Sequence, residues 1–341
     1  MTEVRIASSF PYARASLPAQ RARRNDRERV SLRTTMARAP TPSRLVGFIG
    51  FEDDRSRARW WSHMCDRERE DPKFSLDAPY VKCRRLYVDS VWSLCEDHRL
   101  AETTAHVATR YYDLAMQREP AGGVLLEDFT LDEVRIAAVL IAAKFEEHEA
   151  PTLKAIRGPS RAASIEARRM RDAEAAVAAR LNWRLSVVTA LQCFEHLHTS
   201  NLIMHPSDLV RGAPLSRSPK ARKFVVTYAR FFCNMTLQSS TFQLPPPSKL
   251  AAAIVRATRQ LLNIAPAWPD RLARFTGYAD VAPLADDVLA YYQSEFPDHH
   301  QSVQTFASSP KSVADASRLF PEDAPPDAAA GYEDATRSFF N

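Results

Sequence analysis

The chain has 341 residues, enough for one large or two medium-sized domains with a substantial core. It has 46 basic and 41 acidic residues, a net charge of +5, but ten arginines and three acids give the first 44 residues +7. The remaining 36 basic and 38 acidic residues sum to −2, a balance that argues against direct binding to nucleic acid.

Several classes of catalytic and ligand site are missing from the sequence. There are only eight glycines, and neither GxGxxG nor GxxxxGK[ST], the loops that hold nucleotide phosphates, occurs. HExxH and GxSxG are also absent. The five cysteines are scattered, and none of them forms a CxxC pair. We therefore expect no enzymatic activity, no cofactor and no metal site.

Both ends of the chain have the composition of disordered segments. Residues 1–44 mix Arg, Ser, Pro and Ala without a sustained period, and residues 296–341 are polar and rich in proline. The first segment lacks the apolar stretch of a secretory signal, and no stretch approaches the ~18 apolar residues of a membrane span. We expect two disordered tails, no membrane contact, and a location in the nucleus, the cytoplasm or both.

The body between the tails is predicted to be all-α. Its segments repeat with the 3.6-residue period of helices, and alternating strand patterns are nearly missing. We expect a short N-terminal helix and linker within 45–79 and two five-helix units, 80–185 and 186–295. In chain order, the predicted helices cover residues 56–69, 80–97, 101–117, 131–147, 152–157, 162–182, 187–200, 219–240, 246–263, 268–275 and 281–295.

The predicted helix 131–147 carries a broad apolar stripe rich in alanine, which allows neighbouring helices to approach closely. We expect it to be the central helix of a bundle. Its end lies in LIAAKFEEHEAP (140–151), where Lys144 follows the apolar run and precedes an acidic cluster. A cation is favoured at a helix C-terminus. Lys144 is therefore either a simple capping residue or part of a binding surface.

Successive stretches of the chain resemble the cyclin family. LIAAKFEEHEAP is similar to the family's LASKFEEIYPP pattern, with the lysine and glutamates in register. The resemblance covers about residues 56–295 and implies two tandem five-helix cyclin folds, the second of the type found in A/B cyclins. The other matching stretches are CRRLYVDSVWSLCEDHRLAETTAHVATRYYDLAMQ (83–117), MRDAEAAVAARLNWRL (170–185), LPPPSKLAAAIVRAT (244–258) and WPDRLARFTGYADVAPLADDVLAYY (268–292).

The resemblance implies a regulatory subunit that binds and activates a cyclin-dependent Ser/Thr protein kinase and so controls cell-cycle progression. The family's kinase-binding pair falls on Lys144 and Glu174, whose side chains bond main-chain groups of the kinase in cyclins. Phe145, Glu147 and His148 fall beside this pair. Two alternatives stay open: a cyclin-fold scaffold and a transcription-related adaptor, neither of which activates a kinase.

The resemblance also assigns a short N-terminal helix and an internal ion pair. Trp60, Trp61 and Met64 fall on the family's N-terminal helix, where they either contact the kinase or close the core of the box itself. The family's internal Arg–Asp bridge falls on Arg84 and Asp113. We expect this pair to be structural and to connect the first helix of the box to the second.

The family's substrate-docking patch is altered in this chain. Compared with the family pattern, Cys83 replaces Met, Leu86 replaces Ile, Tyr87 replaces Leu and Ser90 replaces Trp. The family's acid at the next patch position is replaced by Ser93. The patch is therefore predicted to be degenerate, which weakens the expectation that kinase substrates or inhibitors dock there.

One phosphorylation motif lies in the basic tail. Thr41 begins the sequence TPSR, which fits the proline-directed preference of cyclin-dependent kinases. A phosphate at this position would change the contacts of the tail. A match of four residues also arises by chance, so both interpretations stay open.

Overall fold

The computed structural model describes residues 53–117, 126–156, 167–217 and 221–296. The two predicted tails, apart from Phe296, and the predicted phosphorylation site at Thr41 lie outside the described residues. No helix in the described part of the chain has the length and hydropathy needed to cross a membrane.

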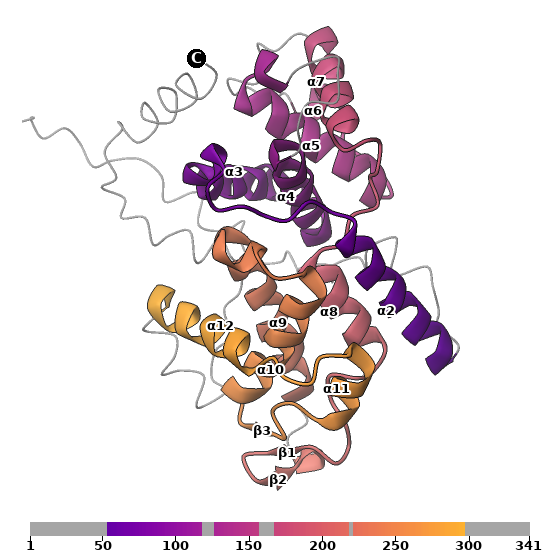
Figure 1. Ribbon diagram of the computed structural model, residues 1–341, viewed down its shortest axis with the longest axis vertical. Helices are drawn as coiled ribbons and strands as arrows, with labels where there is room; N and C mark the ends of the chain where they lie inside the picture. The colour runs from indigo at the N-terminus through magenta and orange to yellow at the C-terminus, as the bar shows by residue number, and fades with distance from the viewer. Residues whose placement is uncertain (1–52, 118–125, 157–166, 218–220, 297–341) are drawn as a thin grey trace, which may run out of the picture. The chain divides into compact units, whose positions relative to one another are not determined.

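The first group of helices surrounds α5, as Figure 1 shows. A capping box between Thr130 and Glu133 begins α5, in which the Thr130 hydroxyl accepts from the Glu133 amide. Alanines on α5, including Ala137 and Ala142, are fully buried and allow its neighbours to approach closely. The elements of this group are η1 (Pro79–Lys82), α3 (Arg84–Asp97), α4 (Glu102–Gln117), η2 (Leu126–Asp128), α5 (Leu131–Glu146), α6 (Leu153–Ile156) and α7 (Ala167–Arg180).

The second group surrounds α10 and has its own apolar core. A second capping box, between Thr189 and Gln192, begins α8. Pro247 occupies the first turn of α10, where its missing amide hydrogen costs no helical bond. Phe296 is buried against Phe231, so this fold extends one residue beyond the predicted boundary. Its helices are α8 (Ala190–Thr199), α9 (Ala221–Gln238), η5 (Thr241–Gln243), α10 (Pro247–Leu261), α11 (Asp270–Thr276) and α12 (Ala282–Glu295).

The second group also contains a small sheet that the sequence did not predict. The strands β1 (Leu209–Val210), β2 (Ala213–Pro214) and β3 (Ile264–Ala265) pair antiparallel in the order β2-β1-β3. A 3-10 turn, η4 (Leu215–Arg217), follows β2. Strands of two residues are too short to produce an alternating pattern, which is why sequence periodicity missed them. Apart from this sheet, the predicted helical architecture of two successive helical units is confirmed for the described residues.

The N-terminal helix α2 (Asp54–Arg69) packs against the second fold. Trp61 is 4% exposed, stacks on His196 and donates from Nε1 to the Thr276 carbonyl at 3.2 Å. Met64 is buried in the same core, and Trp60 is half-buried beside it. Of the two alternatives left open for these residues, burial in a core applies to Trp61 and Met64, although the core is that of the second fold and not of the box.

Polar contacts also fix α2 to the second fold and its linker. The Glu68 carboxylate accepts from the Ser248 amide at 2.9 Å and so caps the N-terminus of α10. Arg67 donates from Nη2 to the Ser186 carbonyl at 2.9 Å. These contacts hold the N-terminal helix against the C-terminal fold.

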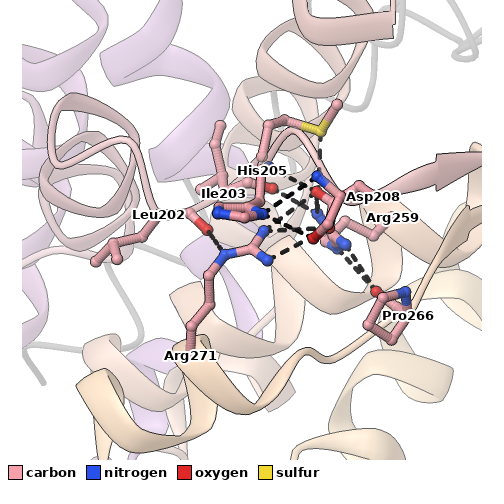
Figure 2. A network of polar contacts seen from close by, with 9 residues as sticks. Leu202, Ile203, His205, Asp208, Arg259, Pro266 and Arg271 are labelled. Atoms are coloured by element: carbon pink, nitrogen blue, oxygen red, sulfur yellow. Dashed lines mark hydrogen bonds and ion pairs between the residues drawn. The ribbon is translucent and has the colours of Figure 1, made fainter. Parts of the chain in front are cut away.

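A buried polar network in the second fold is centred on Asp208 (Figure 2). The Asp208 carboxylate accepts from Arg259 Nη1 at 2.8 Å and from Arg271 Nη2 at 3.1 Å. Arg259 also donates to the carbonyl oxygens of Ile203 and Pro266, both at 2.7 Å. The network joins α10 and α11 to the loop after α8, and each of the three guanidinium nitrogens of Arg259 has an acceptor.

Candidate functional site

Lys144 and Glu174 form an ion pair on the surface of the first fold. Lys144 lies in the last turn of α5, and Glu174 lies in the middle of the neighbouring α7. The Lys144 side chain is 55% exposed, and that of Glu174 is 18% exposed. Two residues thirty positions apart in the chain are thus brought together where a partner could reach them.

The pair borders an apolar hollow of about 350 Å³. Lys144, Glu174 and Arg171 supply its polar rim. The combination of an apolar floor with a few charged groups at the edge suits the insertion of an apolar side chain from a partner. The apolar lining consists of Ile141, Phe145, Ala175, Ala178, Trp183 and Leu185.

Trp183 is the most exposed large apolar side chain among the described residues, at 69%. Asn182 and Trp183 both have positive φ, +52° and +58°, and the Trp183 amide donates to the Ala178 carbonyl at 2.8 Å. This left-handed turn ends α7 and directs the indole to the edge of the hollow. A tryptophan with positive φ is uncommon, which points to a functional constraint. The sequence predicts only that a helix ends at residue 182 and carries no signal that places Trp183 beside the hollow.

The three residues predicted beside the pair have different environments. Phe145 is half-buried and lines the hollow, and His148 is exposed. Glu147 is bound internally, because its Oε1 accepts from the Ala101 amide at 2.7 Å and from the Thr104 hydroxyl at 2.5 Å. This contact caps α4 and engages the carboxylate that was predicted to face a kinase.

Arg84 and Asp113 form a buried ion pair, with side chains 0% and 2% exposed. Arg84 Nε and Nη2 each donate to an Asp113 carboxylate oxygen at 2.8 Å, and Tyr80 is bonded to the same carboxylate. Arg84 Nη1 also donates to the Leu237 carbonyl of α9 at 2.9 Å. The pair therefore connects α3 to α4, as the resemblance implies, and in addition joins the first fold to the second.

Comparison with known protein families agrees with this arrangement. The family model described as "Cyclin, N-terminal domain" matches residues 61–186, and the model "Cyclin, C-terminal domain" matches residues 213–321. The chain belongs to the cyclin family. Members of this family are regulatory rather than catalytic proteins.

The relatives of this cyclin-family protein include proteins of the J and D types. It is 27% identical over 222 residues to Cyclin-J of Xenopus laevis, across 62% of this chain and 55% of the relative. It is 25% identical to human Cyclin-J (65% and 59%) and 28% identical to Cyclin-D of Ostreococcus tauri (59% and 54%). The chain spans a little over half the length of these relatives. The comparisons support the cyclin family as a whole and do not favour the A/B type.

A solved structure has the same fold. The viral cyclin from herpesvirus saimiri aligns with a TM-score of 0.51 and 17% sequence identity, across 68% of this chain and 95% of the viral chain. At this identity the likeness concerns the fold alone, which is that of tandem cyclin domains.

The predicted docking patch of this cyclin-family protein exposes little apolar surface. Cys83 and Tyr87 are buried, and the Tyr87 ring stacks on Tyr112 with centroids 3.4 Å apart. The Ser90 hydroxyl donates to the Tyr87 carbonyl at 2.7 Å. Of the three apolar residues of the patch, Cys83, Leu86 and Tyr87, only Leu86 is exposed, at 46%. One leucine does not make a groove, which agrees with the predicted degeneration.

Glu146, between Phe145 and Glu147, is a buried acid between the two folds. Its side chain is 6% exposed, its Oε1 accepts from Gln192 Nε2 at 3.4 Å, and its Oε2 has no hydrogen-bond partner among the described residues. Burial, with a smaller effect of the Glu147 charge, raises the pKa of the Glu146 carboxyl to about 7.

We expect Glu146→Gln to reduce the loss of stability as the pH rises. The Glu146 carboxyl loses its proton near pH 4.5 in the unfolded chain but only near pH 7 in the folded chain. The stability that the bound proton contributes is therefore complete below pH 4.5 and is lost as the pH rises through about 7. The difference is on the order of 3 kcal/mol. Urea unfolding of both proteins across this range measures it. Equal slopes of unfolding free energy against pH would contradict the prediction.

Proposed function

We propose that the chain binds a cyclin-dependent Ser/Thr protein kinase through the surface around Lys144 and Glu174, activates it, and thereby controls cell-cycle progression in the nucleus or the cytoplasm. The observation that carries the proposal is the exposed Lys144–Glu174 ion pair at the edge of an apolar hollow. Membership of the cyclin family supports it.

The chemistry of this surface suits the main chain of a partner. The Lys144 ammonium has donors to spare and the Glu174 carboxylate has acceptors to spare, so together they can bond both carbonyl and amide groups. Phe145 and Trp183 add apolar contact beside them. Binding in this way would move the regulatory helix of the kinase, so that the kinase's own Lys–Glu pair and metal site assemble.

The double variant Lys144→Ala/Glu174→Ala is expected to lose kinase binding and activation. The variant removes hydrogen bonds between charged side chains and the partner's main chain, each worth about 1.5–3 kcal/mol, so affinity should fall by at least about tenfold. The tagged full chain would be recovered from a eukaryotic lysate, and kinase activity on histone measured. Lys154→Ala, which changes an exposed lysine of α6, is the matched control and should retain activity.

Circular dichroism and thermal melts would establish that the double variant is folded. Activity that accompanies the wild type and the Lys154→Ala control but not the folded double variant supports the proposal. Kinase activity that is equal in all three proteins would exclude this surface. If the folded wild type recovers no kinase activity, the scaffold or adaptor function is favoured instead.

A further inference from the structure

The second fold contains a groove of about 740 Å³ that is separate from the Lys144–Glu174 surface. It lies between the loop that follows α9, the start of α10 and the side of α12. Its apolar lining includes Phe242, Leu244, Pro245, Val281, Leu284 and Tyr291.

One side of this groove is formed by Leu244, an apolar side chain that is exposed to solvent. Its side chain is 48% exposed, although it lies beside Phe242, which is 5% exposed. The rings of Phe242 and Tyr291 pack with centroids 5.5 Å apart and form a firm floor. Prolines at 245 and 246 restrict the loop that carries Leu244. Because the loop is already restricted, it loses little conformational entropy when an apolar side chain of a partner covers Leu244.

The charges of the groove favour a cationic partner. Asp280 and Asp287 oppose a single basic residue, Lys249, among the lining residues. Asp280 is fixed in place because its Oδ1 accepts from the Ala282 amide at 2.7 Å. Asp287 is exposed and takes part in no ion pair within the described part of the chain. A lysine or arginine inserted here would find the Asp287 carboxylate without an ion-pair partner among the described residues.

The helix α12, which forms one side of the groove, is joined by an ion pair to α3, the helix that carries the degenerate patch. Arg85 Nη2 and Glu295 Oε2 lie 3.1 Å apart and join α3 to α12. Tyr291, which lines the groove, lies one helical turn before Glu295 on α12. Leu86, the exposed leucine of α3, is the residue after Arg85. An extended segment could therefore contact both α12 and α3.

We propose that this groove binds a short extended segment of a partner protein in which a lysine or arginine is flanked by bulky apolar residues. The apolar side chains would pack against Leu244 and Tyr291, and the cation would pair with Asp287. This docking role goes beyond the proposed kinase activation and does not depend on it, because peptide binding can be measured with no kinase present.

The test is selection of a random nonapeptide library, displayed on phage, against the immobilised full chain. Enriched peptides should combine a basic residue with apolar residues. Their synthetic forms should bind at least about tenfold more weakly to Leu244→Asp and to Asp287→Lys than to the wild type. Leu209→Asp is the matched control, because Leu209 is a 41% exposed leucine of β1 in the same fold. It should bind like the wild type.

A charge reversal makes the test sharper. Replacing the basic residue of a selected peptide by glutamate should restore part of its binding to Asp287→Lys. The same peptide should gain no affinity for Leu209→Asp. Enrichment of no peptide, of acidic peptides, or of peptides that bind all variants equally would overturn the proposal. Self-association of the wild type that Leu244→Asp abolishes would overturn it too, since the groove would then bind a second copy of this chain.

Discussion

Asp113→Ala is expected to lower the free energy of unfolding by about 3–5 kcal/mol, because it leaves the Arg84 guanidinium buried without a counter-charge. Arg84 is 0% exposed, so water cannot replace the lost carboxylate. The same guanidinium holds the Leu237 carbonyl of the second fold, so its displacement would also weaken the junction of the two folds. Urea unfolding followed by circular dichroism measures the change.

Two further variants test the cause. Asp66→Ala removes the partner of Arg69 in an ion pair whose side chains are 61% and 73% exposed, and it should cost no more than about 1 kcal/mol. The double variant Arg84→Met/Asp113→Leu removes both buried charges and should be more stable than Asp113→Ala. If Asp113→Ala costs no more than Asp66→Ala, the buried pair is not the connection between α3 and α4 that we describe.

The helices of both folds could be predicted from the sequence because each carries its own local signals. The helix that the apolar stripe predicts at 131–147 corresponds to α5, Leu131–Glu146. The predicted helix at 281–295 corresponds to α12, Ala282–Glu295. Periodicity and capping act over a few residues, so one chain suffices to read them.

The part of the candidate site that depends on contacts between distant residues could not be predicted from local sequence patterns. Lys144 and Glu174 could be paired only through the resemblance to cyclins, since spacing alone left Lys144 as a possible cap. Trp183 was missed, because its role depends on a left-handed turn at the end of α7. The sequence left open whether Trp61 contacts a partner or fills a core, because its burial depends on contacts with His196 and Thr276, more than a hundred residues away.

Buried polar pairs also depend on contacts between distant residues and could not be predicted from local patterns. Arg259 and Asp208 are 0% exposed, yet a lone arginine in a helix normally indicates a solvated face. Fifty-one residues separate the two partners, and no local pattern links them. Their association emerges only when α10 packs against the loop after α8, so it becomes visible in the structure and not in the sequence.

Asp208→Asn is therefore expected to destabilise the second fold by about 3–5 kcal/mol near neutral pH. The amide keeps the size of the carboxylate but leaves Arg259 without a counter-charge and Arg271 with a weaker acceptor. Thermal melts and urea unfolding would measure the loss. Asp77→Asn is the matched control, because Asp77 is exposed and its carboxylate forms no ion pair within the described residues.

The pH dependence separates loss of charge from loss of packing. Burial raises the pKa of the Asp208 carboxyl, but the hydrogen bonds from Arg259, Arg271 and the His205 amide, with the Arg259 charge, together outweigh it and lower this pKa below the usual 3.8. The ionised carboxylate thus contributes stability that is present above pH 3.8 and lost as the pH falls through the lowered pKa. Asp208→Asn should remove this acid-dependent loss, whereas Asp77→Asn should retain it. A parallel decline of all three proteins in acid would mean that the charge of Asp208 does not hold the network together.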